Sequence, residues 1–374
     1  MKRALAIYIH IPFCVKKCDY CDFFSVVTGD DEKETYAKAL LAEIRATKVS
    51  IDCEVHSVFF GGGTPSSLKS EWIGKIMVVL MAKFQFSANA EISIECNPGT
   101  VDKDKLRAYK SFGINRISFG LQSTSNAELL LLGRIHTYED FLESYNMARK
   151  VGFDNISVDL MSALPGQSVD SWRESLNKIG KLGPEHISAY SLIIEAGTPF
   201  ATRELALPSE DDEREMYEET LMILAEFGYH QYEISNYSRP GLECQHNIGY
   251  WERREYLGFG ASAASLVNDV RYSNVSNLKQ YQENSDELVA IRCDIEALDE
   301  EAKMEEVIFL GMRMMNGISN TEFETEFGVS LRTAYGERID KLVTQELLNF
   351  DEYNLKLTRQ GISVSNYVFM ELLT

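Results

Sequence analysis

The regular alternation of extended and helical segments constrains the fold more than any other feature of this sequence. From the first residues to about residue 236, apolar runs of strand length alternate with amphipathic stretches of helix length. Such alternation is typical of β/α units that build a mainly parallel sheet. The expected strands are Ala4–Ile9, Val55–Phe60, Glu91–Cys96, Asn115–Leu121, Asn155–Leu160, His186–Leu192 and about His230–Ile234, and the expected helices include Glu32–Thr47, Glu71–Phe84, Tyr138–Val151 and Asp211–Phe227.

Three of these strands carry apolar side chains on one face and polar side chains on the other. Ile117 and Phe119 alternate with Arg116 and Ser118, and the strands at 91–96 and 155–160 repeat the pattern. An ordinary closed β/α barrel fills its interior with branched apolar residues. Polar interior rows therefore predict an α/β fold in which a partial, open β/α barrel surrounds a polar ligand.

The pattern changes after residue 300. The order of helices and a small hairpin predicts a winged-helix-like module, which we interpret as a lid or an interaction domain. We divide the chain into a barrel (1–236), a connecting segment without clear periodicity (237–300) and a C-terminal module (301–374). The expected elements of the module are helices at Ala302–Met315, after the capping signal Ser319–Glu322, at Leu331–Gln345 and at the end of the chain, and strands at Leu347–Phe350 and Leu355–Leu357.

The charge of the chain argues against nucleic acid as a partner. The net charge is −20, and the C-terminal module holds 12 acidic and 7 basic side chains. A nucleic-acid site needs a basic surface that displaces counterions, and no sustained one occurs. Acidic stretches such as Glu210–Glu213 fit the first turns of solvated helices.

We expect a cytoplasmic protein without a transmembrane segment. No apolar run approaches the roughly 20 residues that cross a bilayer, and the run after Met1-Lys2-Arg3 has no small-residue cleavage site. Docking on a membrane complex stays compatible with this composition. Seven cysteines are an odd number, which fits a reducing compartment without a disulfide framework. The four scattered cysteines are predicted to be buried small hydrophobes: Cys53, Cys96, Cys244 and Cys293.

The other three cysteines lie within eight residues, directly after the first expected strand. Cys14, Cys18 and Cys21 can bind three irons of a [4Fe–4S] cluster. The fourth iron is then open to chelation by the amine and carboxylate of one small molecule. This spacing predicts an iron–sulfur cluster with a site for a small ligand.

Zinc is the alternative occupant of the cysteine loop. Its fourth ligand would be His10, Asp19 or Asp22. Structural zinc sites usually pair two short ligand spacings, and the chain has no second Cys-x-x-Cys. A loop without any metal is the third interpretation.

A glycine turn follows the second expected strand. Gly61-Gly62-Gly63-Thr64-Pro65 would let the backbone approach a ligand and bind its charged end. Alone, this sequence indicates only a tight turn. It gains meaning because the first two strands of a barrel end side by side, next to the cysteine loop.

At this point the sequence resembles the radical S-adenosylmethionine (SAM) proteins. More narrowly, it is similar to the group that contains oxygen-independent coproporphyrinogen dehydrogenases (HemN) and HemW-type haem chaperones. The resemblance covers essentially the whole chain. The motifs that carry it are Tyr8–Cys14 through Cys21, the glycine turn, Ile94–Pro98, Ser118–Ser123, Gly133-Arg134, Asp159–Met161, Leu164–Gln167 and Glu195–Pro199.

The resemblance implies which residues bind SAM. Tyr8 and the backbone at Tyr20 would lie against SAM near the cluster, and the turn would meet its methionine part. Independently of the resemblance, three of the implied residues fall on the polar faces of the expected strands. The implied SAM-binding residues are Tyr8, Tyr20, Gly62, Gly63, Thr64, Glu95, Gln122, Arg134 and Asp159.

Three features favour a haem chaperone over a dehydrogenase within this group. Dehydrogenases have a fourth cysteine where this chain has Phe23, and they carry an N-terminal arm before the first strand. His246-Asn247-Ile248-Gly249-Tyr250-Trp251 also resembles the HNxxYW motif of the chaperones. Imidazole is a common axial ligand of haem iron, so we assign His246 to haem, with Cys244 as the alternative.

The resulting hypothesis is a haem chaperone with a [4Fe–4S] cluster, SAM and haem as its ligands. Its partners would be a haem-acceptor protein and an electron donor. The alternative is an enzyme, the radical SAM coproporphyrinogen dehydrogenase, and a zinc-stabilised scaffold is the third class. No catalytic residue is assigned.

Overall fold

A single curved sheet organises the molecule. We analysed a computed structural model that describes residues 2–48 and 52–373. The sheet has twelve strands in the order β12-β11-β10-β9-β1-β2-β3-β4-β5-β6-β8-β7. Strands from β9 to β6 in this order pair in parallel, and the remaining pairs are antiparallel. The sheet is open, as the sequence predicted.

The strands of this sheet include all seven that the sequence predicted, with ends displaced by a few residues. They are β1 (Arg3–Ile11), β2 (Cys53–Gly62), β3 (Phe86–Cys96), β4 (Arg116–Gln122), β5 (Ile156–Ser162), β6 (His186–Ser191), β7 (His230–Glu233), β8 (Asn236–Ser238), β9 (Glu255–Phe259), β10 (Ala264–Val267), β11 (Val270–Asn274) and β12 (Arg292–Ala297).

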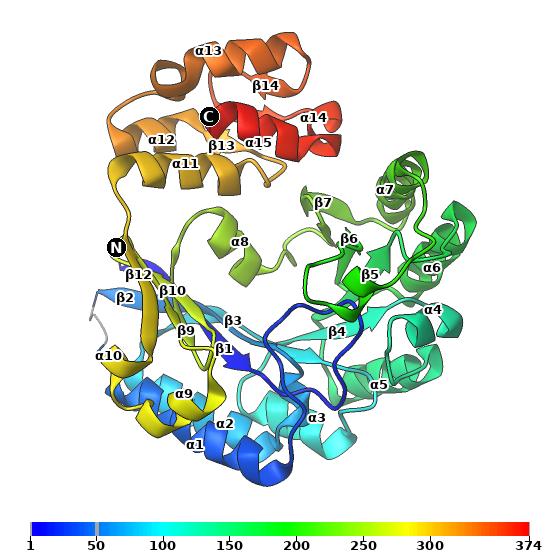
Figure 1. Cartoon of the computed structure of the whole chain (residues 1–374), viewed down its shortest axis with the longest axis vertical. Coiled ribbons are helices and arrows are strands. Elements are labelled where there is room, and N and C mark those ends of the chain that lie inside the picture. The colour runs from blue at the N-terminus through cyan, green and yellow to red at the C-terminus, as the bar shows by residue number, and fades with distance from the viewer. Residues whose placement is uncertain (1, 49–51, 374) are drawn as a thin grey trace.

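Helices of the barrel part cover the convex side of the sheet, whereas α8 lies on its concave side (Figure 1). The helices are α1 (Asp30–Ala46), α2 (Ser70–Lys83), α3 (Lys103–Ser111), α4 (Asn126–Leu131), α5 (Tyr138–Val151), α6 (Val169–Leu182), α7 (Glu210–Glu226), α8 (Gln245–Trp251), α9 (Leu278–Asn284) and α10 (Leu288–Ile291).

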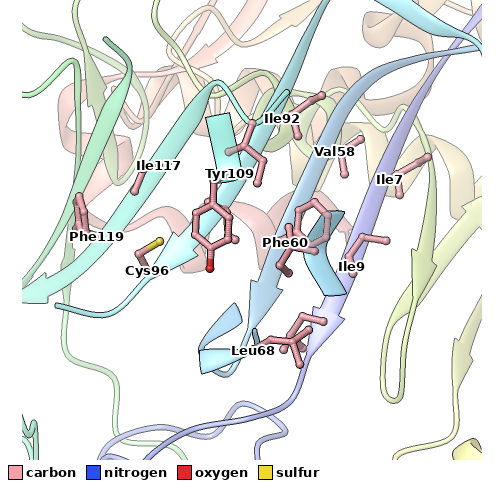
Figure 2. Close-up of a cluster of buried hydrophobic side chains, with 14 of the residues drawn as sticks. Ile7, Ile9, Val58, Phe60, Leu68, Ile92, Cys96, Tyr109, Ile117 and Phe119 are labelled. Atoms are coloured by element: carbon pink, nitrogen blue, oxygen red, sulfur yellow. The ribbon is translucent and has the colours of Figure 1, made fainter. Parts of the chain in front are cut away.

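The apolar rows of the strands form the core under the convex-side helices. Ile117 and Phe119 of β4 are fully buried there, together with Ile7 of β1 and Phe60 of β2. Figure 2 shows these side chains gathered on one side of the neighbouring strands. Burial of each such side chain contributes roughly 1.5–3 kcal/mol. The opposite, polar rows are thereby turned toward the concave side.

Local signals in the sequence set the helix ends. Thr137 and Asp140 form a reciprocal capping box at the start of α5, which Gly152 ends with a left-handed φ of 97°. The acidic stretch Glu210–Glu213 forms the first turn of α7, after the capping residue Ser209. Its negative charges therefore interact favourably with the helix dipole at the N-terminus, as predicted.

The segment 237–300, expected to connect two parts, instead extends the sheet. β9 pairs in parallel with β1, and β10, β11 and β12 follow as antiparallel strands. A buried carboxylate helps to hold this extension, because Glu43 of α1 accepts hydrogen bonds from Gly260 N at 2.8 Å and Asn274 Nδ2 at 2.7 Å. These contacts join residues more than 200 positions apart, which a local pattern does not reveal.

The C-terminal module has the predicted order of helices and a hairpin, together with a third short strand that the sequence did not indicate. Its sheet has the order β13-β15-β14, and its core is separate from that of the large sheet. Figure 1 shows the module above α8. The elements are α11 (Glu300–Gly311), β13 (Ile318–Ser319), α12 (Asn320–Phe327), α13 (Leu331–Thr344), β14 (Leu348–Phe350), β15 (Asn354–Leu357), α14 (Arg359–Ser363) and α15 (Ser365–Leu373).

None of the helices in residues 2–48 and 52–373 has the length and apolar character needed to cross a bilayer.

Candidate functional site

The polar rows of the strands line a cavity of about 390 Å³ on the concave side of the sheet. The cysteine loop and α8 complete its wall. All the residues assigned from the sequence to cluster, SAM or haem meet in this one cavity. They are Tyr8, Cys14, Cys18, Tyr20, Cys21, Gly62, Gly63, Thr64, Glu95, Gln122, Arg134, Asp159 and His246.

Backbone hydrogen bonds fix the cysteine loop against its surroundings. Cys14 N donates to Val26 O at 3.0 Å, and Asp19 N donates to Leu132 O at 3.1 Å. The Asp19 carboxylate also pairs with Arg203 at 2.8 Å. The loop is therefore held at both its start and its middle, which presents the three thiols to the cavity.

Two hydrogen-bond donors approach the thiols. Thr64 Oγ1 lies 3.6 Å from Cys14 Sγ, and Arg134 Nη1 lies 3.5 Å from Cys18 Sγ. Burial, and then the neighbouring Cys18 and Cys14, raise the pKa of Cys21. When all three cysteines are thiolates they repel one another, so they need a positive counter-charge. Three thiolates on one cavity wall fit an iron–sulfur cluster with one open iron, which supplies that charge.

The side chains considered as a fourth zinc ligand include two that are engaged elsewhere. His10 bonds the Tyr8 hydroxyl through Nδ1 at 3.1 Å and Phe24 O through Nε2 at 3.0 Å. Asp19 is paired with Arg203. Within residues 2–48 and 52–373, no three His, Cys, Asp or Glu side chains are gathered around a single metal-ion position.

The glycines of the turn are required by close packing against the end of β1. A Cβ at Gly62, which has a φ of 111°, would come within 2.5 Å of the His10 ring, and one at Gly63 within 2.9 Å of the Phe13 backbone. Thr64 N donates to Phe13 O at 2.7 Å. The turn and the cysteine loop are thus one packed unit at the edge of the cavity.

Two carboxyl groups and two guanidinium groups face the cavity. Burial, and then the charge of Asp159, raise the pKa of Glu95 to about 8, although Gly62 N donates to it at 3.1 Å. Burial also raises the pKa of Asp159, which accepts from Ser118 Oγ at 3.2 Å. Arg116 and Arg134 each keep a buried Nε without a partner among the described residues. The carboxyl groups can bind positive groups of a ligand and the guanidinium groups can bind negative ones, so the site fits a ligand that carries both.

Strand β3 holds the helix that carries His246. The Glu91 carboxylate accepts from Gln245 N at 3.1 Å, from His246 N at 3.3 Å and from Cys244 Sγ at 3.4 Å. The two backbone N–H groups belong to the first turn of α8 and have no acceptor within the helix, and a carboxylate at that end is stabilised by the helix terminus. Glu91 therefore fixes the start of α8 against the sheet.

The His246 ring is 1% exposed and stacks on Phe59 with a centroid distance of 5.1 Å. Its Nδ1 lies 3.0 Å from Ser57 Oγ, and its Nε2 lies 3.1 Å from the Tyr250 hydroxyl. Burial, and then the charge of Arg116, lower the pKa of His246 to about 3. The imidazole is consequently neutral at physiological pH.

The other candidate residues of this region do not share the cavity wall. Cys244, the alternative haem ligand, is fully buried at the N-cap of α8, and burial raises its pKa to about 12. Trp251 lines a second cavity of about 550 Å³ between α8 and the C-terminal module. Cys53 and Cys96 are buried as predicted, and Cys96 also lines the main cavity. Cys293 is partly exposed, so the prediction for that cysteine is wrong. It lies on β12, the edge strand of the sheet, whose side chains are largely exposed.

Comparison with known proteins identifies the family. Residues 8–179 match the radical SAM superfamily, and residues 298–364 match the HemN C-terminal domain. The chain is 34% identical to the haem chaperone HemW of Lactococcus lactis subsp. lactis (strain IL1403), over 100% of this chain and 98% of that protein. It is 36% identical to the haem chaperone HemW of Bacillus subtilis (strain 168), over 97% of each chain. The chain belongs to the HemW family.

A solved structure of a related protein has the same fold as this chain. The coproporphyrinogen III oxidase HemN from Escherichia coli, described as a radical SAM enzyme, superposes with a TM-score of 0.86 at 27% identity. The match covers 100% of this chain and 91% of that protein. The predicted fold class, an open β/α barrel of the radical SAM type, is confirmed.

The cavity of this HemW-family chain also includes residues that the sequence analysis did not select. Asn97 accepts from Arg134 Nη2 at 2.6 Å, and Tyr190 donates to Gln122 Oε1 at 2.9 Å. Asn97 lies within a motif of the resemblance, and Tyr190 shares the inward face of β6 with Ser188. Period-two alternation along β6 could have indicated both of these β6 residues.

Proposed function

We propose that this chain is a cytoplasmic haem chaperone, which binds haem beside a SAM-coordinating [4Fe–4S] cluster and delivers the haem to acceptor proteins. One observation carries this proposal. His246 of the HNxxYW sequence lies on the wall of the same cavity as Cys14, Cys18 and Cys21. The names of the matched relatives, haem chaperones HemW, agree with this arrangement.

In this proposal the three thiolates hold the cluster. When bound, the cluster would supply an open iron for chelation by the amine and carboxylate of SAM, together with one-electron redox chemistry. Arg134 would keep the Cys18 thiolate oriented through its hydrogen bond, and Thr64 would do the same for Cys14. The donor set supports this assignment, because all three cysteines face one cavity.

SAM would occupy the charged part of the cavity. It carries a sulfonium and an amine as positive groups and a carboxylate as its negative group. Glu95 and Asp159 would face the positive groups, and Arg134 would face the negative one. A cation close to Glu95 would lower its raised pKa and relieve the charge repulsion with Asp159. Tyr8, Tyr20, Gly62, Gly63 and Gln122 would complete the walls around SAM.

Haem would bind on the side of α8. His246 would be the axial ligand, and its low pKa keeps the imidazole neutral and able to coordinate iron. Phe59 and Tyr250 lie next to the ring and offer flat surfaces to a macrocycle. The haem acceptor and the electron donor would approach the cavity from outside, and an acceptor in a membrane complex is compatible with this arrangement.

The alternative function is radical SAM oxidation of coproporphyrinogen III. The close superposition with the HemN structure favours it. Phe23 argues against this alternative, because it stands where such dehydrogenases have a further cysteine. The residue is 64% exposed and lines the cavity. Turnover of coproporphyrinogen III with SAM, measured by porphyrinogen product, would support this alternative.

Anaerobic haem titration tests the proposal. The protein should be purified anaerobically, with iron and acid-labile sulfide measured first, and haem binding then followed at the Soret band. We expect stoichiometric haem binding by wild type and a loss of at least about tenfold in affinity in His246→Ala, because an axial bond is removed. A matched control is His136→Ala, whose ring bonds Leu121 O outside the main cavity. No haem binding by wild type would refute the chaperone function.

A further inference from the structure

The two ring nitrogens of His246 are both covered by hydroxyl groups. Ser57 reaches Nδ1 from β2, and Tyr250 reaches Nε2 from the last turn of α8. Among the described residues, neither hydroxyl makes a second hydrogen bond. Tyr250 lines the cavity, whereas Ser57 is buried behind the ring. Nε2 is consequently the nitrogen on the side from which a ligand would arrive.

A second array in the same molecule has the same composition. Ser157 Oγ lies 2.8 Å from His186 Nδ1, and the Tyr232 hydroxyl lies 2.9 Å from His186 Nε2. There Cys244 N donates to the Tyr232 oxygen at 3.3 Å, which leaves the Tyr232 proton for His186 Nε2. The main cavity is lined by none of the side chains of Ser157, His186 and Tyr232. This array shows how a serine and a tyrosine divide the two nitrogens of a buried histidine.

The acidities of the two hydroxyls give the same direction at His246. A phenol is intrinsically a stronger hydrogen-bond donor than an aliphatic hydroxyl. On this basis we assign Tyr250 as the donor to Nε2 and Nδ1–H as the donor to Ser57, because the ring position alone fits either tautomer. This tautomer is the one that histidine ligands commonly adopt, with the second nitrogen donating to a neighbouring acceptor.

We propose that Ser57 and Tyr250 are positioning residues with opposite effects on haem binding at His246. Ser57 holds the Nδ1 proton and so keeps the lone pair on Nε2. Tyr250 caps that lone pair in the haem-free protein, and its hydroxyl leaves when iron binds. The inference rests on the proposed function, since it assumes that His246 is the axial ligand.

The surrounding contacts indicate that the Tyr250 side chain moves rather than the helix. Glu91 fastens the first turn of α8 through three hydrogen bonds. Ser57 and Glu91 are direct neighbours in the pairing of β2 with β3, so the sheet holds the ring and the helix start together. The Tyr250 hydroxyl has only His246 as its partner among the described residues.

Haem titration of two variants tests the inference. Tyr250→Phe should increase haem affinity by roughly threefold to tenfold, because one hydrogen bond no longer has to be broken. Ser57→Ala should decrease it by roughly tenfold, as loss of a bonded neighbour does at other metal-binding histidines. Ser57→Thr keeps the hydroxyl and should restore most of the affinity.

The matched controls come from outside the cavity. Ser157→Ala removes the equivalent serine from His186, and Tyr229→Phe removes a buried tyrosine hydroxyl that bonds Pro184 O. Both should bind haem as wild type does. Circular dichroism of all variants checks that they fold.

Nitrogen-15 NMR of histidine in the haem-free protein gives a readout that is independent of haem. The His246 signals, assigned by their loss in His246→Ala, should show a proton on Nδ1 in wild type and a shifted tautomer equilibrium in Ser57→Ala. Loss of haem binding in Tyr250→Phe would overturn the inference, because Tyr250 would then be a ligand. Unchanged affinity in Ser57→Ala would also overturn it. No binding by wild type would instead refute the proposed function, and this inference with it.

Discussion

Two histidines with nearly the same neighbours have very different positions in this molecule. His246 and His186 are each bonded by one serine and one tyrosine, and both are almost completely buried. Burial, and then the charge of Arg116, lower the pKa of both. His186 lies on a strand inside the sheet, whereas His246 lies on a short helix that lines the cavity.

The comparison teaches that local chemistry alone does not mark a ligand-binding histidine. A satisfied, neutral and buried imidazole is a common structural element. The difference lies in what surrounds the tyrosine. Tyr232 is also bonded by Cys244 N and is enclosed, whereas Tyr250 has a single bond and faces the cavity. Accessibility of Nε2 after one bond is broken separates the two sites.

Replacing each histidine by alanine should break the comparison most strongly. His186→Ala removes a fully buried ring, which leaves the Ser157 hydroxyl without a partner and the Tyr232 O–H without an acceptor, although Cys244 N still donates to the Tyr232 oxygen. We expect a loss of about 3–5 kcal/mol in the free energy of unfolding, from the cavity and the unsatisfied hydroxyls. Urea unfolding measures this loss. At low temperature, where the variant stays folded, its haem affinity should match wild type, whereas His246→Ala should lose affinity. Equal losses of haem affinity would remove the distinction.

The large parallel sheet could be predicted from the sequence because its strands carry a period-two pattern. The polar faces of β3, β4 and β5 predicted a polar interior, and Glu95, Gln122 and Asp159 indeed line the cavity. Parallel strands place their carboxyl ends at one edge, so residues distant in the chain were expected to meet there. The fold class could therefore be derived from local pattern and strand adjacency.

The extension of the sheet and the neighbours of His246 could not be derived in this way. β9 pairs with β1, which lies more than 240 residues earlier in the chain, so no local pattern indicates the pairing. β12 is largely exposed and therefore lacks an alternation of buried and exposed side chains. Ser57 and His246 are 189 positions apart. Nothing in the strand Val55–Phe60 marks Ser57 as the partner of a distant histidine, because such a contact depends on how α8 lies against the sheet.

Acid should destabilise both arrays to a similar extent. The folded-state pKa of His246 is lowered to about 3, whereas an unfolded histidine titrates near 6.5. As the pH falls below 6.5, the unfolded chain therefore binds a proton that the folded chain does not, and stability is lost. The loss is about 2 kcal/mol at pH 5 for one such group.

The measurement is the difference in urea unfolding between wild type and His246→Gln from pH 8 to pH 5. Buried carboxyl groups with raised pKa values, such as Glu43, make the protein more stable as the pH falls and so act in the opposite direction. Their contribution is the same in wild type and variant, so the difference between the two isolates the contribution of His246. His186→Gln should reduce the acid sensitivity in the same way. An unchanged slope in both variants would show that these rings are protonated in the folded state.

Glu91→Gln should affect the array on α8 more strongly than the array around His186, which Glu91 reaches only through Cys244 and Tyr232. The amide keeps one acceptor oxygen but turns an NH₂ group toward backbone N–H donors, so at least one charge-assisted bond to Gln245 N or His246 N is lost. We expect a loss of about 1–2 kcal/mol in unfolding free energy and a severalfold lower haem affinity, because the start of α8 is no longer fixed. His186 needs no such anchor, since strand pairing of β6 with β5 and β8 holds its backbone. Its ¹⁵N signals should shift less than those of His246. Shifts of equal size at both histidines would mean that Glu91 supports the whole polar interior rather than α8 alone.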